Sequence, residues 1–325
     1  MVVLALLVAG CTSAASPART TSLPTRTTGP STTTTTTVTT GWSSPTAVAH
    51  DSSLGAVGCP STTLCLALDD HGDAFRFGGS AWSQAAATGI TASGTPSLSC
   101  ASTAFCSSIV QGADQAATWN GTAFAGPDTL PAQGLGAVGC ATTSFCVTID
   151  GVGDAYYFDG STWSNGANDW GSVSAISCPT TSFCVSVGGG ISMWDGNSWT
   201  EPQSFGLTSN LTSVSCPSVS FCQVVDNTGQ ADAWNGTTWT GPTQVPVPAG
   251  STSGTGAGGV DLTGVSCVAA AFCMAVAGNG AASLWNGTDW SSETVDPHAS
   301  LTSVSCPSPA ICIAVDGRGD ALVYR

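Results

Sequence analysis

Basic residues are scarce in this chain of 325 residues, which has no lysine, five arginines and twenty acidic residues, for a net charge of −15. Arg19 and Arg26 lie among the first forty residues, so three arginines remain for the rest of the chain. Nucleic-acid binding requires basic side chains to neutralise phosphates. The composition therefore argues against nucleic acid as a partner.

Signatures of catalysis are also missing. The three histidines, His50, His71 and His298, are isolated in the sequence and are expected in loops or on the surface, and the only glutamates are Glu201 and Glu293. There is no G-x-S-x-G motif and no defensible Ser/His/Asp set, and WD and kelch signatures are absent. The sequence names no catalytic residue, so whether the protein is an enzyme stays open, with a non-catalytic role expected.

Cysteine, in contrast, is abundant and regular. Fourteen of the fifteen cysteines form seven C-x5-C pairs at intervals of about forty residues. The pairs are Cys59/Cys65, Cys100/Cys106, Cys140/Cys146, Cys178/Cys184, Cys216/Cys222, Cys267/Cys273 and Cys306/Cys312. A fixed period of this length indicates a repeat architecture.

Each repeat contains four short strand patterns. Leu301 to Cys306 alternates apolar and small polar residues, as a strand with one buried face does. Three further patterns are Phe221 to Asp226, Gln230 to Trp234 and Thr237 to Thr240. Asn235-Gly236 joins the last two, and Asn-Gly is a strong hairpin signal because both central residues of a type I′ turn need positive φ. Four strands per repeat predict the blade of a β-propeller.

The ends of the repeat region complete one another. The seventh repeat stops at Tyr324-Arg325, after its third strand, and the segment 40–45 supplies the missing outer strand before the first cysteine pair. The outer-strand aromatics are then Trp42, Trp82, Phe124, Trp163, Trp199, Trp239 and Trp290. We therefore predict an all-β, seven-bladed propeller with four-stranded blades over residues 41–325, closed by its N-terminal strand, which leaves no free sheet edge at the seam.

A second set of aromatics ends the third strands: Phe77, Trp119, Phe158, Trp194, Trp234, Trp285 and Tyr324. Recurrence at one position in every blade is what packing between blades requires. A lectin uses aromatic rings to stack on sugars, but a fully repeated position favours the packing interpretation.

The cysteine pairs have two possible interpretations, disulfides and zinc sites. Each pair brackets a hairpin between the first two strands, where facing residues have Cα atoms about 5 Å apart, within reach of a disulfide. Zinc sites more often show C-x2-4-C spacing and need four ligands at one place. The spacing therefore favours seven structural disulfides, each contributing about 2 kcal/mol by loop entropy. They imply an oxidising, extracytoplasmic location.

The fifteenth cysteine has a separate context. Residues 1–10 are apolar and end Val8-Ala9-Gly10 before Cys11, which resembles a bacterial lipobox. The resemblance implies a signal peptide over 1–11, lipid modification of Cys11 and anchoring at the cell membrane. No basic residue precedes Arg19, a departure that a start site upstream of Met1 would explain. The alternative is an ordinary signal peptide and a secreted protein.

Residues 12–40 are rich in Ser, Thr and Pro. Such a segment has almost nothing to bury, so we expect a disordered stalk between the anchor and the propeller. No stretch of the chain is apolar for the 18 or more residues that a membrane span needs. The membrane is therefore expected to be a partner through the lipid anchor alone.

Many acidic residues fall in the connection between the second and third strands: Asp69, Asp70, Asp73, Asp150, Asp154, Asp226, Asp316 and Asp320. In a closed propeller these connections share one face with the blade-to-blade loops, including a Pro/Gly/Ser-rich insertion at 242–259. We hypothesise that this face binds a partner, and an acidic rim is a weak indication of Ca²⁺. The alternative is that Asp-x-x-Gly is simply good turn chemistry.

Two resemblances bear on function. Asp159 to Trp163 and Asp195 to Trp199 resemble the end of the Asp-box repeat of sialidase-type propellers, although one residue is missing between Asp and Trp, and sialidases need several arginines. The unit S-C-x5-C-x-A-V-D-x-x-G resembles the repeat of secreted actinobacterial propellers. We expect a monomeric, cell-surface binding or scaffold module for an extracytoplasmic protein or glycan. The alternative is an Asp-box-type glycan hydrolase or lyase.

Overall fold

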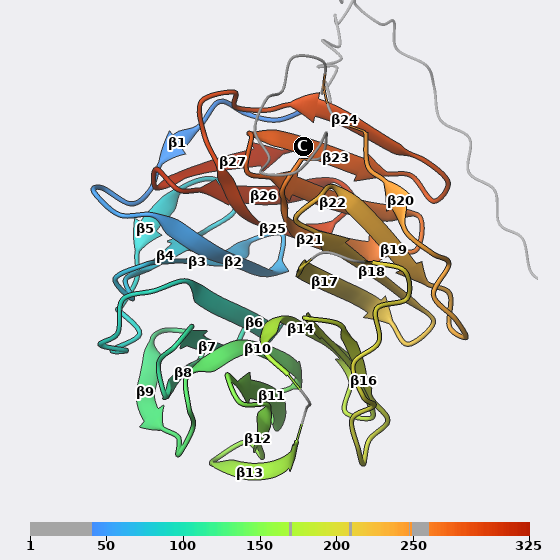
Figure 1. Ribbon diagram of the computed structural model, residues 1–325. Coiled ribbons are helices and arrows are strands. Elements are labelled where there is room, and N and C mark those ends of the chain that lie inside the picture. The colour runs from blue at the N-terminus through green and yellow to red at the C-terminus, as the bar shows by residue number, and fades with distance from the viewer. Residues whose placement is uncertain (1–40, 169–170, 208–209, 247, 249–259) are drawn as a thin grey trace, which may run out of the picture. The chain divides into compact units, whose positions relative to one another are not determined.

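Seven antiparallel sheets surround a central channel in the computed structural model, which describes residues 41–168, 171–207, 210–246, 248 and 260–325 (Figure 1). The described residues belong to one compact unit and contain no helix, hence none long and apolar enough to cross a membrane. The fold is the predicted all-β seven-bladed propeller. The expected signal peptide 1–11, Cys11 and the stalk 12–40 lie outside the described residues.

Each blade is a meander whose first strand lines the channel. These inner strands are β2 Leu54–Ser61, β6 Pro96–Ser102, β10 Leu135–Thr142, β14 Val173–Thr180, β17 Leu211–Ser218, β21 Leu262–Ala269 and β25 Leu301–Ser308. The second strands are β3 Leu64–Asp69, β7 Phe105–Val110, β11 Phe145–Asp150, β15 Phe183–Gly188, β18 Phe221–Asp226, β22 Phe272–Ala277 and β26 Ile311–Asp316. We number the blades 1 to 7 in this order.

The third and fourth strands are shorter and lie farther from the channel. The third strands are β4 Ala74–Phe77, β8 Gln115–Trp119, β12 Asp154–Phe158, β16 Ile191–Trp194, β19 Gln230–Trp234, β23 Ala281–Trp285 and β27 Asp320–Tyr324. The outer strands are β5 Trp82–Gln84, β9 Phe124–Thr129, β13 Trp163–Asn168, β20 Thr243–Gln244 and β24 Trp290–Thr294. In blade 4 the outer strand is reduced to two isolated bridges, Trp194 with Trp199 and Ile191 with Gln203.

Blade 7 is closed by the start of the described chain, as predicted. Its sheet has the order β1-β27-β26-β25, with β1 at Thr46–Ala47. Trp42 bridges Tyr324, and Gly41 and Arg325 exchange two backbone hydrogen bonds of 2.7 and 3.1 Å. The Arg325 guanidinium also donates to the Gly79 carbonyl oxygen in blade 1, at 2.8 Å.

The hydrophobic core consists of wedges between neighbouring blades rather than one central cluster. One wedge joins Ile313 and Val315 of blade 7 to Ala67 and Phe75 of blade 1. In every blade the predicted third-strand and outer-strand aromatics pair with each other, with ring centroids 5.3–5.8 Å apart. The rings meet across the outer hairpin of their own blade, whereas the sequence suggested packing between blades.

All seven cysteine pairs are disulfides, with Cα atoms 3.9–4.1 Å apart. This spacing is shorter than the expected 5 Å, although the cysteines face each other across the hairpin as predicted, as Cys140 and Cys146 do. The bonds support an oxidising, extracytoplasmic environment.

The two cysteines of a pair differ in their surroundings, which the sequence did not predict. The second cysteine of each pair has no exposed surface: Cys65, Cys106, Cys146, Cys184, Cys222, Cys273 and Cys312 are all 0% exposed. Each lies on the second strand of its blade, inside the sheet, where it packs in the wedge against a neighbouring blade. These seven residues are therefore core residues as well as disulfide partners, and a ligand at the surface cannot contact them.

Serines of the inner strands join the blades to one another. At five of the seven interfaces, the serine before the first cysteine accepts a hydrogen bond from the first-cysteine N–H of the next blade, at 2.9–3.0 Å. Ser305 of blade 7 and Cys59 of blade 1 form one such pair. In blades 1 and 3 the position is Gly58 or Gly139, and a Cβ on Gly139 would lie 2.7 Å from Ile176. The blades pack closer there in place of the hydrogen bond.

Candidate functional site

The two faces of the propeller carry different connections. In blade 1, Leu54 at the start of the inner strand pairs with Asp69, whereas Ser61 at its end pairs with Leu64 beside the disulfide hairpin. We call the side with the second-to-third-strand connections and the blade-to-blade connections the Asp-turn face. The opposite side, which bears the disulfide hairpins, is the disulfide face. This distribution matches the one expected from the sequence.

Four of the predicted site residues, Asp69, Asp150, Asp226 and Asp316, are buried at the first position of their turns, with at most 2% of their surface exposed. The Oδ1 atom of each accepts the N–H groups of the residues two and four positions later. The two distances are 3.0 and 2.7 Å at Asp69, 3.0 and 2.9 Å at Asp150, 2.9 and 2.8 Å at Asp226, and 2.9 and 2.9 Å at Asp316. These carboxylates hold the turns together.

The second carboxylate oxygens of these residues have different surroundings. Asp69 Oδ2 accepts the Ser52 hydroxyl at 2.7 Å, and Asp150 Oδ2 accepts the Gln133 N–H at 2.9 Å. Asp316 Oδ2 is buried without a hydrogen-bond partner among the described residues. An unsatisfied buried oxygen costs free energy, so the blade 7 turn is less favourable than the blade 1 turn.

The remaining predicted aspartates are distributed around the face. Asp73, Asp154 and Asp320 are partly buried near the starts of third strands in blades 1, 3 and 7. Burial, and then the nearby Asp316 carboxylate, raise the pKa of Asp320 above its ordinary value. The structure does not gather these aspartates into one cluster: over the described residues, the one group of three potential metal ligands within reach of each other is Asp69, Asp70 and His71.

On the Asp-turn face the central channel widens into a mouth, and we call the mouth and the channel together the funnel. The mouth has a volume of about 600 Å³ and the channel about 330 Å³. The two cavities share the lining residues Gly55, Thr95, Pro96, Thr263 and Thr302. Asp70 and His71 are the charged or titratable residues of the mouth, and the described lining of the channel has none.

The mouth lies beside blades 1 and 2, whose inner strands contribute Gly55 and Pro96 to its lining. Four residues before the first cysteine, blades 5, 6 and 7 have threonine; the Thr302 hydroxyl bridges blade 7 to blade 1 by donating to the Leu54 carbonyl at 2.6 Å. The corresponding residues in blades 1 to 4 are Gly55, Pro96, Gly136 and Ser174. A Cβ on Gly55 would lie 2.5 Å from the Pro96 Cδ atom, so the two strands approach closely. With no side chain from Gly55, the mouth extends to Asp70 and His71.

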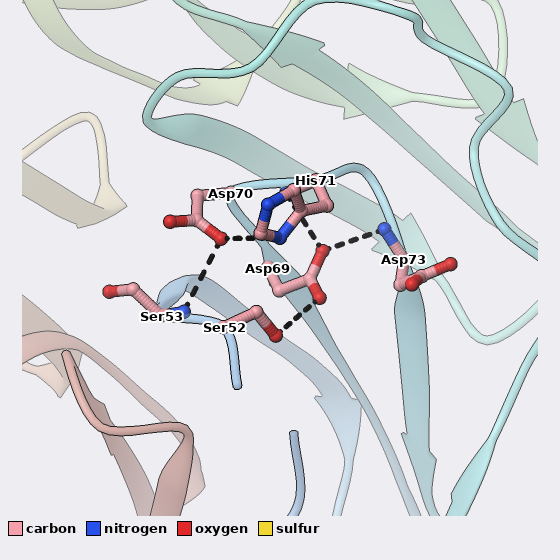
Figure 2. A network of polar contacts seen from close by, with 6 residues as sticks. All are labelled: Ser52, Ser53, Asp69, Asp70, His71 and Asp73. Atoms are coloured by element: carbon pink, nitrogen blue, oxygen red, sulfur yellow. Dashed lines mark hydrogen bonds and ion pairs between the residues drawn. The ribbon is translucent and has the colours of Figure 1, made fainter. Parts of the chain in front are cut away.

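Asp70 and His71 lie side by side on the rim of the mouth, above the buried Asp69 (Figure 2). His71 Nδ1 lies 3.0 Å from Asp70 Oδ1, and the side chains are 60% and 42% exposed. The same Asp70 oxygen accepts the Ser53 N–H at 3.3 Å. The His71 backbone N–H donates to Asp69 Oδ1, so the buried turn fixes where both rim residues sit.

A metal ion would find few free ligands at this rim. The potential ligand atoms of Asp69, Asp70 and His71 lie within 4.8 Å of one another. Both Asp69 oxygens, however, already accept hydrogen bonds, from Ser52 and from the turn N–H groups. Because Ca²⁺ takes six to eight oxygen ligands, the described residues fall short of such a site on their own. Calcium binding stays a prediction.

The insertion at 242–259 is described only at 242–246 and 248, and the rest of this predicted binding loop lies outside the described residues. Val245 is buried, and its N–H donates to the Gly229 carbonyl at 2.9 Å. The Ser292 hydroxyl of blade 6 donates to the Pro246 carbonyl. Beyond the insertion, burial and then Asp226 raise the pKa of Asp261. The insertion therefore starts from a base packed against blades 5 and 6.

Sequence reasoning listed Asp70 among many aspartates and set His71 aside as a surface residue, so it missed their pairing. A signal for it was present. The blade 1 turn reads D-D-H-G-D, whereas blades 3 and 7 have glycine after the first aspartate. Comparison of each turn with the repeat, rather than a count of aspartates, would have pointed to the blade 1 turn.

Solved structures similar to this chain share its fold at low sequence identity. A structure described as YCF48 bound to D1 peptide has a TM-score of 0.67 and 13% identity over 87% of this chain and 94% of that one. The WD40 repeats of RRP9 have a TM-score of 0.70 and 10% identity over 86% of this chain and 99% of that one. The WD40 propeller domain of Doa1 has a TM-score of 0.69 and 12% identity over 88% of this chain and 97% of that one. No family model and no curated protein matches the sequence. These likenesses concern the fold alone.

Proposed function

We propose that this protein is a non-catalytic binding or scaffold module that recognises an extracytoplasmic protein through the funnel on its Asp-turn face. The observation that carries the proposal is the asymmetry of the funnel. Its mouth lies beside blades 1 and 2, where Gly55 and Pro96 line it and the rim carries Asp70 and His71. Concave sites with few, well-placed polar groups are where proteins bind their ligands.

The propeller itself supports this role. Seven disulfides, the serine hydrogen bonds between blades and the aromatic pairs make a rigid support, and binding residues commonly lie on loops held by such a scaffold. One of the similar structures has a peptide bound, as its description states. For the present chain we infer a protein partner, with a glycan as the other outcome of the test.

The location proposed for this module is the outer side of a cell membrane. The disulfides fit an oxidising environment, and the lipobox-like sequence before Cys11 supports acylation there. Residues 12–40 would then act as a stalk that holds a monomeric propeller away from the lipid. Mass spectrometry of the membrane fraction tests this, because acylated Cys11 adds a lipid mass that Cys11→Ser cannot carry.

The alternative of a glycan hydrolase is not favoured by the geometry. Glycosidases of the usual kind need two carboxylates, about 5–10 Å apart, on either side of the bond they cleave. Among its described lining residues, the funnel supplies one carboxylate, Asp70. The Asp-box-like residues Asp159 and Asp195 are exposed in outer hairpins. Hydrogen bonds from neighbouring backbone N–H groups lower the pKa of both carboxyls. These two aspartates therefore stabilise the turns of those hairpins.

The test is to fill the mouth with a bulky side chain. Thr95 is exposed and lines both cavities, so Thr95→Trp narrows the funnel without disturbing the core. Thr62→Trp, in the exposed disulfide hairpin of blade 1, is the matched control on the opposite face. Each purified full-length variant is immobilised, exposed to cell-envelope proteins of the source organism and, separately, to a glycan array.

We expect wild type and Thr62→Trp to retain the same protein and Thr95→Trp to lose it. Equal retention by all three would overturn the proposal, and binding on the glycan array alone would replace the protein with a glycan. Repeating the assay with EDTA tests the calcium prediction, because a Ca²⁺-dependent site would lose its ligand.

A further inference from the structure

We propose that the segment received by the funnel is flexible and basic, and that one of its lysine or arginine side chains pairs with Asp70. This inference rests on the proposed function, because it specifies the chemistry of the partner at the same site. It follows from three observations: the charge of the propeller, the free oxygen of Asp70 and the neutral lining around it.

The charge of the propeller selects for cations. Residues 41–325 carry all twenty acidic residues and three arginines. Arg325 is bonded to the Gly79 carbonyl and Arg76 lies on the third strand of blade 1, so Arg318, in the blade 7 turn, is the arginine on the Asp-turn face. A surface of one sign attracts partners of the other and raises their rate of association.

Asp70 has the capacity to bind a cation. Its Oδ1 atom accepts the Ser53 N–H and contacts His71, whereas its Oδ2 atom has no partner within the described part of the chain. In Figure 2 this oxygen points away from the hydrogen-bonded network of the turn. The carboxylate is 42% exposed at the rim, so a cation reaches it without breaking a bond that holds the turn.

Apart from Asp70 and the neighbouring His71, the funnel has no charged or titratable residue among its described lining. The buried first aspartates of the turns do not line it, and its walls are serine, threonine, glycine, proline, Gln111 and aliphatic residues. A basic side chain entering the mouth therefore meets one counter-charge, with hydroxyls and apolar surface for its methylene stem. A channel of about 330 Å³ admits a single extended segment rather than a folded surface.

The probe is a pair of fluorescent Gly/Ser peptides of equal length, one with evenly spaced lysines and one with glutamates at the same positions. Fluorescence polarisation measures their Kd for the full-length protein. Asp70→Asn removes the proposed counter-charge. Asp159→Asn is the matched control: Asp159 is exposed in the outer hairpin, which lies on the disulfide side, and the hydrogen bond from the Thr162 N–H and then that from the Ser161 hydroxyl lower its pKa to about 2, so it is charged.

The control also keeps its turn. Asparagine occupies the corresponding position in three other blades, as Asn120, Asn235 and Asn286, and its side-chain oxygen accepts the same N–H groups there. Asp70→Asn and Asp159→Asn therefore make the same change in net charge on opposite faces. A difference between them reports the position of the carboxylate rather than the total charge.

We expect the lysine peptide to bind wild type and Asp159→Asn with the same Kd, and Asp70→Asn about fivefold more weakly, the size of one partly exposed ion pair. Added salt should weaken the first two more than the third. The inference is overturned if the lysine peptide does not bind, if Asp70→Asn and Asp159→Asn weaken it equally, if the glutamate peptide binds as well, or if Thr95→Trp binds like wild type.

The two proposals fail in different ways. If Thr95→Trp loses the envelope protein but Asp70→Asn retains it and binds both peptides alike, the funnel is the binding site and the basic segment is wrong. If Thr95→Trp retains the envelope protein, the proposed function itself is wrong, whatever the peptides do.

Discussion

Blades 1 and 7 are neighbours and have the same turn, yet blade 1 lines the mouth of the funnel whereas blade 7 is hydrogen-bonded to its neighbour at the corresponding position. In both, the first aspartate, Asp69 or Asp316, accepts two N–H groups in almost the same geometry. Blade 7 adds Thr302, whose hydroxyl bonds the Leu54 carbonyl of blade 1, whereas blade 1 has Gly55 in that place. The same backbone position therefore links two blades in blade 7 and lines a cavity in blade 1.

The comparison teaches that a repeat fixes the scaffold while its exceptions locate the site. Asp70 and His71 occupy the positions that Gly317 and Arg318 have in blade 7. The turn tolerates either pair because its hydrogen bonds come from backbone N–H groups. Side chains at these two positions are free to take a role in binding.

The largest change in stability is expected from Gly55→Ala, which adds a side chain to blade 1 where its inner strand approaches that of blade 2 most closely. The added Cβ would clash with the Pro96 Cδ atom, at 2.5 Å, so the free energy of unfolding should fall by about 2–3 kcal/mol. Urea denaturation measures this. Gly264→Ala, where a Cβ finds contacts of 3.4 Å or more, is the control and should change little. Recovery in Gly55→Ala/Pro96→Ala would confirm the cause; failure to recover would contradict it.

A smaller effect is expected from exchanging the partners of the two buried carboxylates. Ser52→Ala removes the hydroxyl on Asp69 Oδ2 and should lower the free energy of unfolding by about 1–2 kcal/mol. In blade 7 the equivalent residue is Ala299, and Asp316 Oδ2 has no partner among the described residues. Ala299→Ser should raise stability by up to about 1 kcal/mol. The midpoints of urea denaturation, compared at constant m-value, measure both changes in stability. A loss of stability in Ala299→Ser would show that the hydroxyl does not reach Asp316.

The smallest effect concerns pH. Burial and Asp316 raise the folded-state pKa of Asp320 above 3.8, so folding holds its proton more tightly than the unfolded chain does. Its contribution to stability is therefore present below pH 3.8 and is lost as the pH rises through the raised pKa. Asp320→Asn should be more stable than wild type at neutral pH, and its stability should change less between about pH 4 and 7. Thermal unfolding across that range measures it, with Asp73→Asn in blade 1 as the comparison; identical slopes for wild type and Asp320→Asn would contradict it.

The sequence predicted the scaffold well because its signals are local. Cysteine spacing, Asn-Gly turns and alternating strands recur in each unit, and Trp42 matched the outer-strand position that blade 7 lacks. Repetition of the aromatics indicated packing, although in every blade the third-strand and outer-strand rings pair within the blade. Each of these features depends on residues within one blade, or on a position repeated seven times.

The site depends on contacts that no repeat shows. Whether an aspartate is a turn residue or a free carboxylate is decided by which backbone N–H groups surround it, so Asp69 and Asp70 looked alike in the sequence. The opening at Gly55 depends on Pro96 of the next blade. The serines were seen only as small polar residues of a strand, because their partners lie one blade away, about forty residues along the chain.

Those serines give the ring a direction. Every one that bonds the next blade accepts from it, so at these five interfaces one blade edge donates and the facing edge accepts. A chain with a blade deleted would carry two complementary, unsatisfied edges. Head-to-tail association between copies would then replace closure, and when the rotation does not close, such contacts grow into filaments. We therefore expect the closed seven-bladed ring to leave no such edge for association with another copy.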